Sequence, residues 1–175
     1  MKNITCLLTL VFFLASITGI KAQEGNSRSL DTKVVTQIGI VVKDIEETSQ
    51  AYAKLFGMET PQVIETDGYS KTNAHYRGEP TKARAKLAFI RLENITIEII
   101  EPIGGPSTWQ EFLDKHGEGV HHIAFRVEDM DKTIAMLETK GGELVQRGDF
   151  TGGSYSYVES QDKLKTIIEL LTSED

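Results

Sequence analysis

Four side chains in this sequence could together hold a divalent metal ion. They stand in or beside short apolar segments, and they are Gln37, Glu98, His122 and Glu169. One imidazole, one amide oxygen and two carboxylates form a mostly oxygen site, which suits Mn²⁺, Fe²⁺, Co²⁺, Ni²⁺ or Zn²⁺ and leaves positions open for water or substrate. An unpaired carboxylate in an apolar strand is costly. We therefore expect a shared cation or, as the alternative, pairing of each glutamate with lysine or arginine.

The four positions are equivalent in an internal repeat. The segment IGIVVKDIEET, which follows Gln37, returns as IAFRVEDMDKT after His122, at an offset of 85. The segment IEII around Glu98 returns as IELL around Glu169, at an offset of 71. The difference of 14 residues places an insertion in the first copy. Because all four positions share one symmetry, the repeat favours the metal site over separate ion pairs.

Each copy of the repeat predicts the element order β-α-β-β-β. Asp44 and Asp129 are expected to cap the two helices, which Gly57 and Gly142 end. Strands are expected at residues 35–42, 58–65, 85–92 and 95–101, and again at residues 120–127, 143–146, 155–159 and 166–171. Neither half could bury both faces of its sheet alone. We predict an α+β fold in which two tandem βαβββ modules form one curved, cup-like mixed sheet.

Strand alternation predicts which residues face the open side of the sheet. The apolar residues that alternate with His122 would pack on the helices, so His122 and Arg126 face the other way. The small residues Gly39 and Ala124 make room there. Arg126 could hold an anionic group of the substrate or pair with one of the two glutamates. His121, one position earlier, is expected to point to the opposite face and to be structural.

The insertion in the first copy, residues 66–84, is long and polar but carries aromatic residues. Loops of this length in compact domains are usually functional or disordered. His75 could swing over the open face as an acid or base, with a solvated loop histidine as the alternative. Tyr76 could contact the substrate, and Glu79 could assist proton transfer.

The first 22 residues resemble a cleavable export signal. Lys2, an apolar run over residues 7–17 and the small residue Ala22 form this pattern, which predicts a secreted or periplasmic protein. Residues 23–33 are polar, and we expect a flexible leader. The remaining residues predict one domain, 34–173, made of a first module, a linker and a second module at residues 34–101, 102–119 and 120–173.

Charge and composition restrict the partners. Loss of residues 1–22 removes Lys2, Lys21 and the only cysteine, which leaves 17 of the 19 basic residues against 26 acidic residues, a net charge of −9. No basic cluster or basic amphipathic helix is present, which argues against nucleic acid and anionic membrane as partners. We expect a small-molecule substrate and no disulfide bonds.

The duplicated modules with histidine, glutamine and glutamate at matching positions resemble the vicinal oxygen chelate superfamily, which includes glyoxalases, bleomycin-resistance proteins, ring-cleaving dioxygenases and methylmalonyl-CoA epimerases. The resemblance covers residues 34–173 and is nearest to the epimerase-like branch, through IEIIEP at residues 97–102 and GVHHIAFRV at residues 119–127. It implies a glyoxalase-like fold, and metal ligands at Gln37, Glu98, His122 and Glu169. Superfamily members often pair, so a homodimer is the default expectation.

The resemblance implies a metal-dependent isomerase, epimerase or lyase that acts on a small substrate through a metal-stabilised enolate. Glu98 or Glu169 would move the proton by leaving the metal, with His75 as a further candidate. The alternative is a non-catalytic protein that binds and sequesters a small molecule. The sequence departs from the epimerases at Gln37, where they usually have histidine, and at residues 83–86 (ARAK), where they have a carboxylate. An exported protein would also not meet coenzyme A thioesters.

Overall fold

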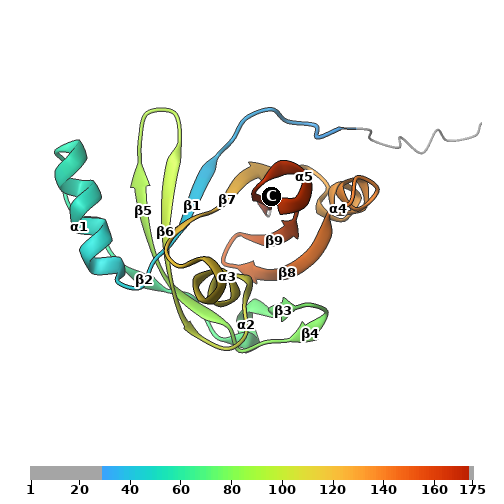
Figure 1. Cartoon of the computed structure of the whole chain (residues 1–175), viewed down its shortest axis with the longest axis horizontal. Coiled ribbons are helices and arrows are strands. Elements are labelled where there is room, and N and C mark those ends of the chain that lie inside the picture. Colours follow the sequence, from blue (N-terminus) through green and yellow to red (C-terminus); the bar gives the residue numbers. More distant parts are fainter. Residues whose placement is uncertain (1–28, 174–175) are drawn as a thin grey trace, which may run out of the picture.

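The computed structural model describes residues 29–173, and its main feature is a curled, ten-stranded mixed sheet (Figure 1). The predicted export signal lies outside the described residues. None of the helices within them is long and apolar enough to cross a membrane. The helices are α1 (Ile45–Phe56), α2 (Tyr69–Thr72), α3 (Thr108–His116), α4 (Met130–Glu138) and α5 (Gln161–Leu164). The strands are β1 (Gln37–Val41), β2 (Ile64–Glu65), β3 (His75–Tyr76), β4 (Glu79–Pro80), β5 (Arg84–Arg91), β6 (Thr96–Gly104), β7 (Gly119–Arg126), β8 (Glu143–Phe150), β9 (Gly153–Glu159) and β10 (Ile167–Ser173).

The strand order shows the duplication that the sequence predicts. The sheet runs β2-β5-β6-β1-β7-β10-β9-β8-β3-β4: four strands of each module form its main part, and β3 and β4 from the insertion of the first module extend the edge of the second. The two modules meet where β1 pairs antiparallel with β7. Within the modules, β1 pairs parallel with β6, and β7 pairs parallel with β10. The predicted curved mixed sheet of two βαβββ modules is confirmed. The first strands of both modules therefore lie side by side at its centre.

Three of the four predicted helix caps are found, whereas α4 ends at Glu138 with Thr139 as its C-cap, before the predicted Gly142. The carboxylate of Asp44 accepts a hydrogen bond from the backbone N–H of Glu47, and the carboxylate of Asp129 accepts one from Lys132. Gly57 ends α1 in the left-handed conformation, with a φ of 65°. The predicted strand at residues 58–65 is wrong in extent, because only Ile64–Glu65 pairs with β5.

Apolar side chains pack on both faces of the sheet. On the outer face, α4 covers Phe125, Val127 and Leu170, while α1 covers a matching cluster in the first module. This confirms the alternation expected for β7. Inside the curl, Trp109 of α3 packs against a third cluster that includes Tyr157. The linker helix therefore fills part of the concave side, where the predicted ligands face.

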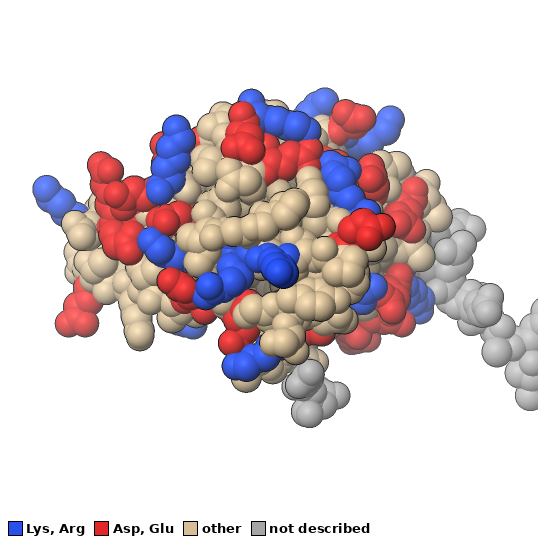
Figure 2. Space-filling model, turned by 90° about the horizontal axis from the view of Figure 1, so that it is seen from below, with Lys and Arg blue, Asp and Glu red and all other residues tan. Residues whose placement is uncertain are grey.

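The insertion of the first module is an ordered segment that reaches the second module. We call residues 66–83 the strap; it contains α2, β3 and β4, and β3 pairs antiparallel with β8. A two-residue turn, Arg77-Gly78, joins β3 and β4 with positive φ angles of 49° and 82°. Seen from below, where the strap lies in Figure 1, acidic and basic side chains are interspersed over the surface (Figure 2). Because the strap follows β2 at one edge of the sheet and its strand β3 pairs with β8 near the other edge, it connects the two edges of the curled sheet.

Candidate metal centre

Gly39 lies between two of the predicted metal ligands. In β1 it pairs with Glu98 of β6 on one side and with His122 of β7 on the other. A Cβ atom at position 39 would lie only 1.9 Å from Cε1 of His122, so the imidazole occupies the space that the missing side chain leaves. The prediction that a small residue makes room here is confirmed.

Ala124 lies between the other two predicted ligands in the same way. It pairs with Gln37 of β1 and with Glu169 of β10. Residues that pair across neighbouring strands project from the same face of the sheet. Because Ala124 is two positions after His122 in β7, both rows face the concave side. Four adjacent strands therefore direct all four predicted ligands towards one point.

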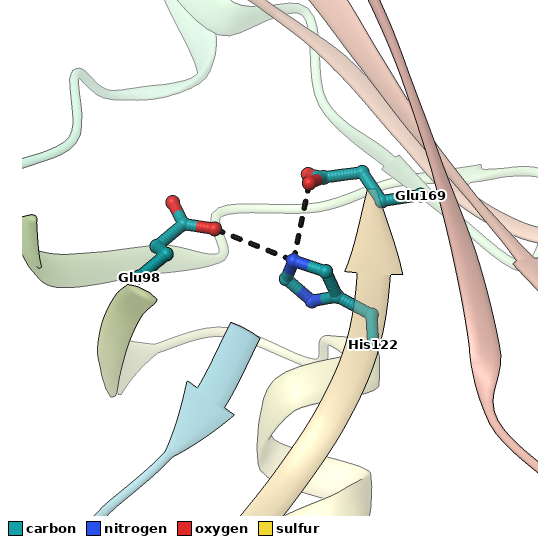
Figure 3. A group of neighbouring side chains, drawn as sticks. All are labelled: Glu98, His122 and Glu169. Carbon is teal, nitrogen blue, oxygen red and sulfur yellow. Dashed lines mark ion pairs between the residues drawn. The ribbon is translucent and has the colours of Figure 1, made fainter. Parts of the chain in front are cut away.

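The donor atoms of three of these residues lie close together (Figure 3). Nε2 of His122 is 3.1 Å from Oε2 of Glu169 and 3.4 Å from Oε2 of Glu98. One possible ligand atom from each residue lies within 4.8 Å of the others, and all three side chains are buried. Among the described residues, no lysine or arginine forms an ion pair with either glutamate. The alternative of separate ion pairs is therefore not found.

The buried donor atoms lack hydrogen-bond partners, which tests whether these residues fit a metal ion. Such atoms are Oε1 of Gln37, Oε2 of Glu98, Nε2 of His122 and Oε2 of Glu169. Buried polar atoms without partners are rare in folded proteins because each one costs free energy. A divalent cation would satisfy all four at once, and three oxygens with one imidazole nitrogen are suitable ligands for it. The residues present fit the cation.

The charges of the cluster depend on burial and on mutual contact. Burial raises the pKa of the Glu98 carboxyl, although His122 acts in the opposite direction. Burial alone would lower the pKa of His122, but Glu169 and Glu98 raise it to about 9. Without a metal, His122 therefore holds a proton between the carboxylates at neutral pH. A metal ion that binds Nε2 has to displace this proton.

His121 does not point to the opposite face, so that prediction was wrong. The pairing register between β1 and β7 shifts here, with Gly39 opposite His122 and Ile40 opposite Val120, so His121 is the extra residue of a β-bulge. Its Nδ1 lies 3.0 Å from Nδ1 of His122. Burial, and then the positive charge of His122, keep the pKa of His121 well below its usual value. A neutral His121 can therefore accept the Nδ1 proton of His122.

The second nitrogen of His121 connects the cluster to the linker helix. Nε2 of His121 lies 3.2 Å from Oγ1 of Thr108, in the first turn of α3. The backbone N–H of Thr108 donates to Oε1 of Gln146 at 2.8 Å, and the side-chain amide of Gln146 donates to the hydroxyl of Tyr155 at 3.4 Å. Metal ligands are commonly oriented by such outer contacts. Here the contacts link His122, through His121, to three other elements, α3, β8 and β9.

A cavity of about 410 Å³ lies against the cluster. Gln37, Glu98 and Glu169 line it on the sheet side, together with Arg126. The rest of the wall comes from both modules, the strap and α3, and includes the apolar and aromatic residues Leu87, Phe89, Trp109, Phe150, Tyr155 and Tyr157. Its size is within the range of small-molecule sites. The candidate ligands thus open into a cavity that a small molecule could enter.

Arg126 is the one predicted substrate-binding residue that the structure brings to this cavity. One of its guanidinium nitrogens donates to the hydroxyl of Ser173, and among the described residues Arg126 forms no ion pair with Glu98 or Glu169. Its guanidinium is therefore available to a ligand.

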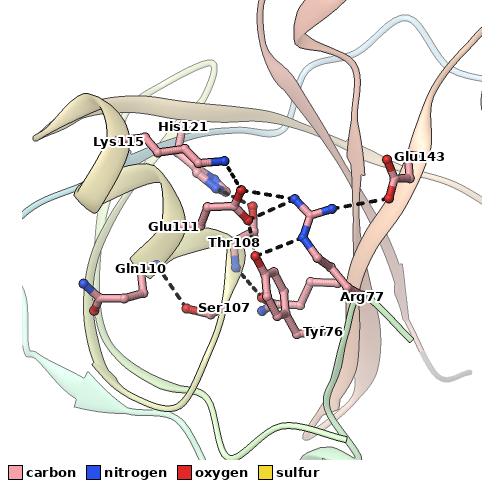
Figure 4. Close-up of polar contacts among 10 residues, drawn as sticks. Tyr76, Arg77, Ser107, Thr108, Gln110, Glu111, Lys115, His121 and Glu143 are labelled. Atoms are coloured by element: carbon pink, nitrogen blue, oxygen red, sulfur yellow. Dashed lines mark hydrogen bonds and ion pairs between the residues drawn. The ribbon is translucent and has the colours of Figure 1, made fainter. Parts of the chain in front are cut away.

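The structure does not bring His75 or Tyr76 to the cavity, which corrects the expectation for both. His75 lies in β3, with Nδ1 2.8 Å from the carbonyl oxygen of Asn73, in a separate hollow beside Arg147. The Tyr76 hydroxyl donates to Glu111 of α3 (Figure 4). Because β3 is paired with β8, the segment cannot swing over the open face as a free loop. Glu79 lies exposed on β4, at the edge of the sheet.

The aromatic residues of the cavity were not predicted, although the strand register could have shown two of them. Phe89 lies directly opposite Glu98 in β5, and Tyr157 lies directly opposite Glu169 in β9. Each carboxylate therefore has an aromatic neighbour on the next strand away from the centre of the sheet, and the two modules are alike in this. Trp109 had no such signal, because its position depends on how α3 packs inside the curl.

The fold and the site define a protein built on paired βαβββ modules with a candidate metal centre on the concave side. The sequence model of the "Glyoxalase/Bleomycin resistance protein/Dioxygenase superfamily" matches residues 36–158, and the chain belongs to this superfamily. The resemblance expected from the sequence is confirmed.

Individual relatives agree with this assignment. An uncharacterized protein of Bacillus subtilis, YqjC, is 25% identical over 136 residues, 76% of this chain and 87% of its own length. An ethylmalonyl-CoA/methylmalonyl-CoA epimerase of Cereibacter sphaeroides is 26% identical over 116 residues, 66% of this chain and 76% of its own length. The crystal structure of methylmalonyl-CoA epimerase from Mycobacterium tuberculosis aligns with a TM-score of 0.57 at 22% identity, over 85% of this chain and 95% of the other. The epimerases are therefore among its relatives.

Proposed function

We propose that this protein is a metal-dependent isomerase or epimerase, or a lyase, that acts on a small substrate with two neighbouring oxygens. The observation that carries the proposal is a group of four buried donor atoms beside the cavity, which make no hydrogen bond outside the group; three of them, from Glu98, His122 and Glu169, lie next to one another. Mn²⁺, Fe²⁺, Co²⁺, Ni²⁺ and Zn²⁺ all suit this donor set. Gln37, Glu98, His122 and Glu169 would hold the ion.

The residues of the site can be given roles in such a reaction. A bound divalent cation would polarise a substrate carbonyl and stabilise the enolate that remains when the adjacent carbon loses its proton. Glu98 is the first candidate to accept that proton, because it lines the cavity and, once it leaves the metal, burial favours its protonated form. Glu169 is the second candidate, from the other module. Arg126 would bind a negatively polarised oxygen of the substrate.

The activity can be tested by proton exchange. Metal-loaded protein would be incubated in D₂O with a panel of small α-hydroxy ketones, ketoaldehydes and α-substituted ketoacids, and deuterium at the α-carbon would be followed by NMR. We expect metal-dependent incorporation that Glu98→Gln lowers at least about 100-fold, the usual contribution of a general base. Incorporation by the variant at the rate of the native protein would assign the proton to another residue.

A non-catalytic binding protein is the second candidate, and one observation favours it. With His75 and Tyr76 outside the cavity, Glu98 and Glu169 are the only buried carboxylates that line it among the described residues. Both are also candidate metal ligands. Two other carboxylates of the wall, Glu65 and Asp67, are held in ion pairs. Saturable, metal-dependent binding without deuterium exchange across the panel would favour this function.

We also propose that the protein is exported and that its substrate is not a coenzyme A thioester. The pattern of residues 1–22 supports export, and residues 83–86 (ARAK) lack the carboxylate of the epimerase relatives. Mass spectrometry of the protein from extracytoplasmic fractions should give an N-terminus at Gln23. An intact Met1 on protein in the cytoplasmic fraction would contradict export.

A further inference from the structure

We propose that the cavity selects a compact, uncharged molecule in which an aromatic or bulky apolar group is attached to the two oxygens that bind the metal. This inference rests on the proposed metal-dependent function and adds the substrate class. It comes from three features of the cavity: the charge of its lining, the nature of its walls and the position of the strap.

The charge of the lining disfavours an anionic ligand. Five carboxylates face the cavity, whereas the only cation among the lining residues is Arg126; the carboxylates are Glu65, Asp67, Glu98, Asp149 and Glu169. A divalent cation at the metal centre would compensate two of these negative charges. Two further carboxylates are compensated by ion pairs, because Lys71 is 2.9 Å from Asp67 and Arg84 is 2.6 Å from Glu65. After these pairs and the metal, Asp149 and Arg126 are the charges that remain, so the lining offers no excess positive charge to hold a phosphate group.

Aromatic side chains form a continuous wall beside the metal centre. The Trp109 ring stacks on Tyr155 at a centroid distance of 6.1 Å and meets Tyr157 edge to face at 5.8 Å. On the other side of the cluster, Phe89 and Leu87 project from β5 into the same cavity. Binding becomes more favourable when an apolar or aromatic group of the ligand displaces water from such a wall.

The mouth of the cavity is apolar on two sides. Ile64 of β2 is 45% exposed and Phe150, at the end of β8, is 44% exposed, and both belong to the lining. These residues come from opposite modules. Large exposed apolar residues at the entrance of a cavity are typical of binding sites for apolar ligands.

The strap limits the length of the ligand. Thr66, Asp67 and Thr72 line the cavity, and Ala83 completes that side at the end of the strap. Asp67 and Asp149 are exposed carboxylates of the lining, so a long acyl carrier with phosphate groups, such as coenzyme A, would place its negative charges near theirs. A short molecule that ends in a ring or a branched chain fits between the metal centre, the aromatic wall and the strap.

Hydroxamates with one metal-binding group and three different tails test this inference. The probes are acetohydroxamate, benzohydroxamate and phosphoglycolohydroxamate, and binding to Zn²⁺-loaded full chain is measured by quenching of Trp109, the only tryptophan of the sequence. We expect benzohydroxamate to bind at least about tenfold more tightly than acetohydroxamate, because its ring becomes buried. Phosphoglycolohydroxamate should bind more weakly than acetohydroxamate. The retained zinc is measured after each titration.

The outcomes separate this inference from the proposed function. If no probe binds in a metal-dependent manner, the metal centre itself is wrong. If all three bind only with zinc, but benzohydroxamate has no advantage or the phosphorylated probe binds most tightly, the metal centre stands and the substrate class is overturned.

Matched variants locate the selectivity. Phe89→Ala should reduce the advantage of benzohydroxamate severalfold while acetohydroxamate binds as before, and Phe56→Ala, on the exposed end of α1, should change neither. Phe150→Ser at the mouth serves as a second test if Phe89→Ala does not fold. An unchanged preference in Phe89→Ala, or in Phe150→Ser where Phe89→Ala does not fold, would overturn the role of the apolar wall.

Discussion

At the scale of single residues, the candidate metal centre depends on small neighbours as much as on the ligands. Gly39 and Ala124 each separate two ligands of adjacent strands, and the ring of His122 lies over Gly39. Without these small residues, the four adjacent strands could not direct four long side chains towards one point. Glycine is therefore needed at position 39 because a side chain would collide with His122, and not because of its backbone conformation, which is that of an ordinary strand.

Gly39→Ala tests this role directly. The added methyl group would overlap the imidazole of His122, so Nε2 must move, and metal affinity should fall at least about tenfold, as for other changes that misplace a metal ligand. The control is Gly68→Ala, because a Cβ atom there has no neighbour within 4 Å. Calorimetric titration with Zn²⁺ measures both. Equal affinities in the two variants would contradict the packing argument.

His121 should act through His122. In His121→Phe the ring still fills the space between Phe112 and Tyr157, which it contacts now, but it no longer accepts the Nδ1 proton of His122. Metal affinity is expected to fall about 10- to 100-fold, and the absorption spectrum of the Co²⁺ form should shift.

The control for this variant is His116→Phe, on the exposed end of α3. A variant that merely unfolds more easily would show a lower melting temperature with an unchanged Co²⁺ spectrum. That result would assign His121 a packing role only.

At the scale of elements, the strap is held in place by β3 and by a charged cluster on α3. Arg77 donates to both carboxylate oxygens of Glu111, at 3.0 and 3.1 Å, and also contacts Glu143 of β8 at 3.3 Å. Tyr76 and Lys115 donate to the same glutamate (Figure 4). Glu111 thus joins the strap to the linker helix, which carries Trp109 in the cavity wall.

The stability that Glu111 provides should depend on pH. Burial alone would raise the pKa of its carboxyl, but Lys115, Tyr76 and Arg77 lower it to about 2. Since the pKa in the folded state lies below the usual value, the contribution is complete above about pH 4.5 and is lost as the pH falls towards 2. Glu111→Gln should lower the free energy of unfolding by about 1–2 kcal/mol at pH 7, after allowance for partial exposure.

Urea denaturation at several pH values measures this difference. The gap between the native protein and Glu111→Gln should shrink as the pH falls from 4.5 to 2, whereas the exposed Glu59→Gln should match the native protein throughout. A gap that stays constant down to pH 2 would show that the charge of Glu111 is not the stabilising feature.

At the scale of the whole molecule, the duplication could be predicted from sequence and the connection between its halves could not. Three patterns can be read directly from the sequence, and each is confirmed: the repeat, the helix caps at Asp44 and Asp129, and the alternation of β7. The bulge at His121 was missed because alternation assumes a regular strand. One residue of register shift is enough to bring two adjacent histidines to the same face.

The strap was harder to predict because its partner is distant in sequence. His75 and Tyr76 pair with Arg147 and Gln146, and the sequence near β3 gives no sign of that pairing. The turn Arg77-Gly78 was a usable signal for a hairpin. Cavity residues such as Trp109 depend on tertiary packing, so they became visible only in the fold.

The central claim is that Glu98 and Glu169 bind one divalent cation together with Gln37 and His122. The most direct measurement is calorimetric titration with Zn²⁺ and Mn²⁺ after chelator treatment, with metal content checked by plasma emission. We expect one equivalent of metal in the native protein, and at least about tenfold weaker binding in Glu98→Gln and in Glu169→Gln, which keep the shape but lose the charge. The exposed Glu128→Gln should bind like the native protein. Native affinity in both ligand variants, or no binding to the native protein, would contradict the claim.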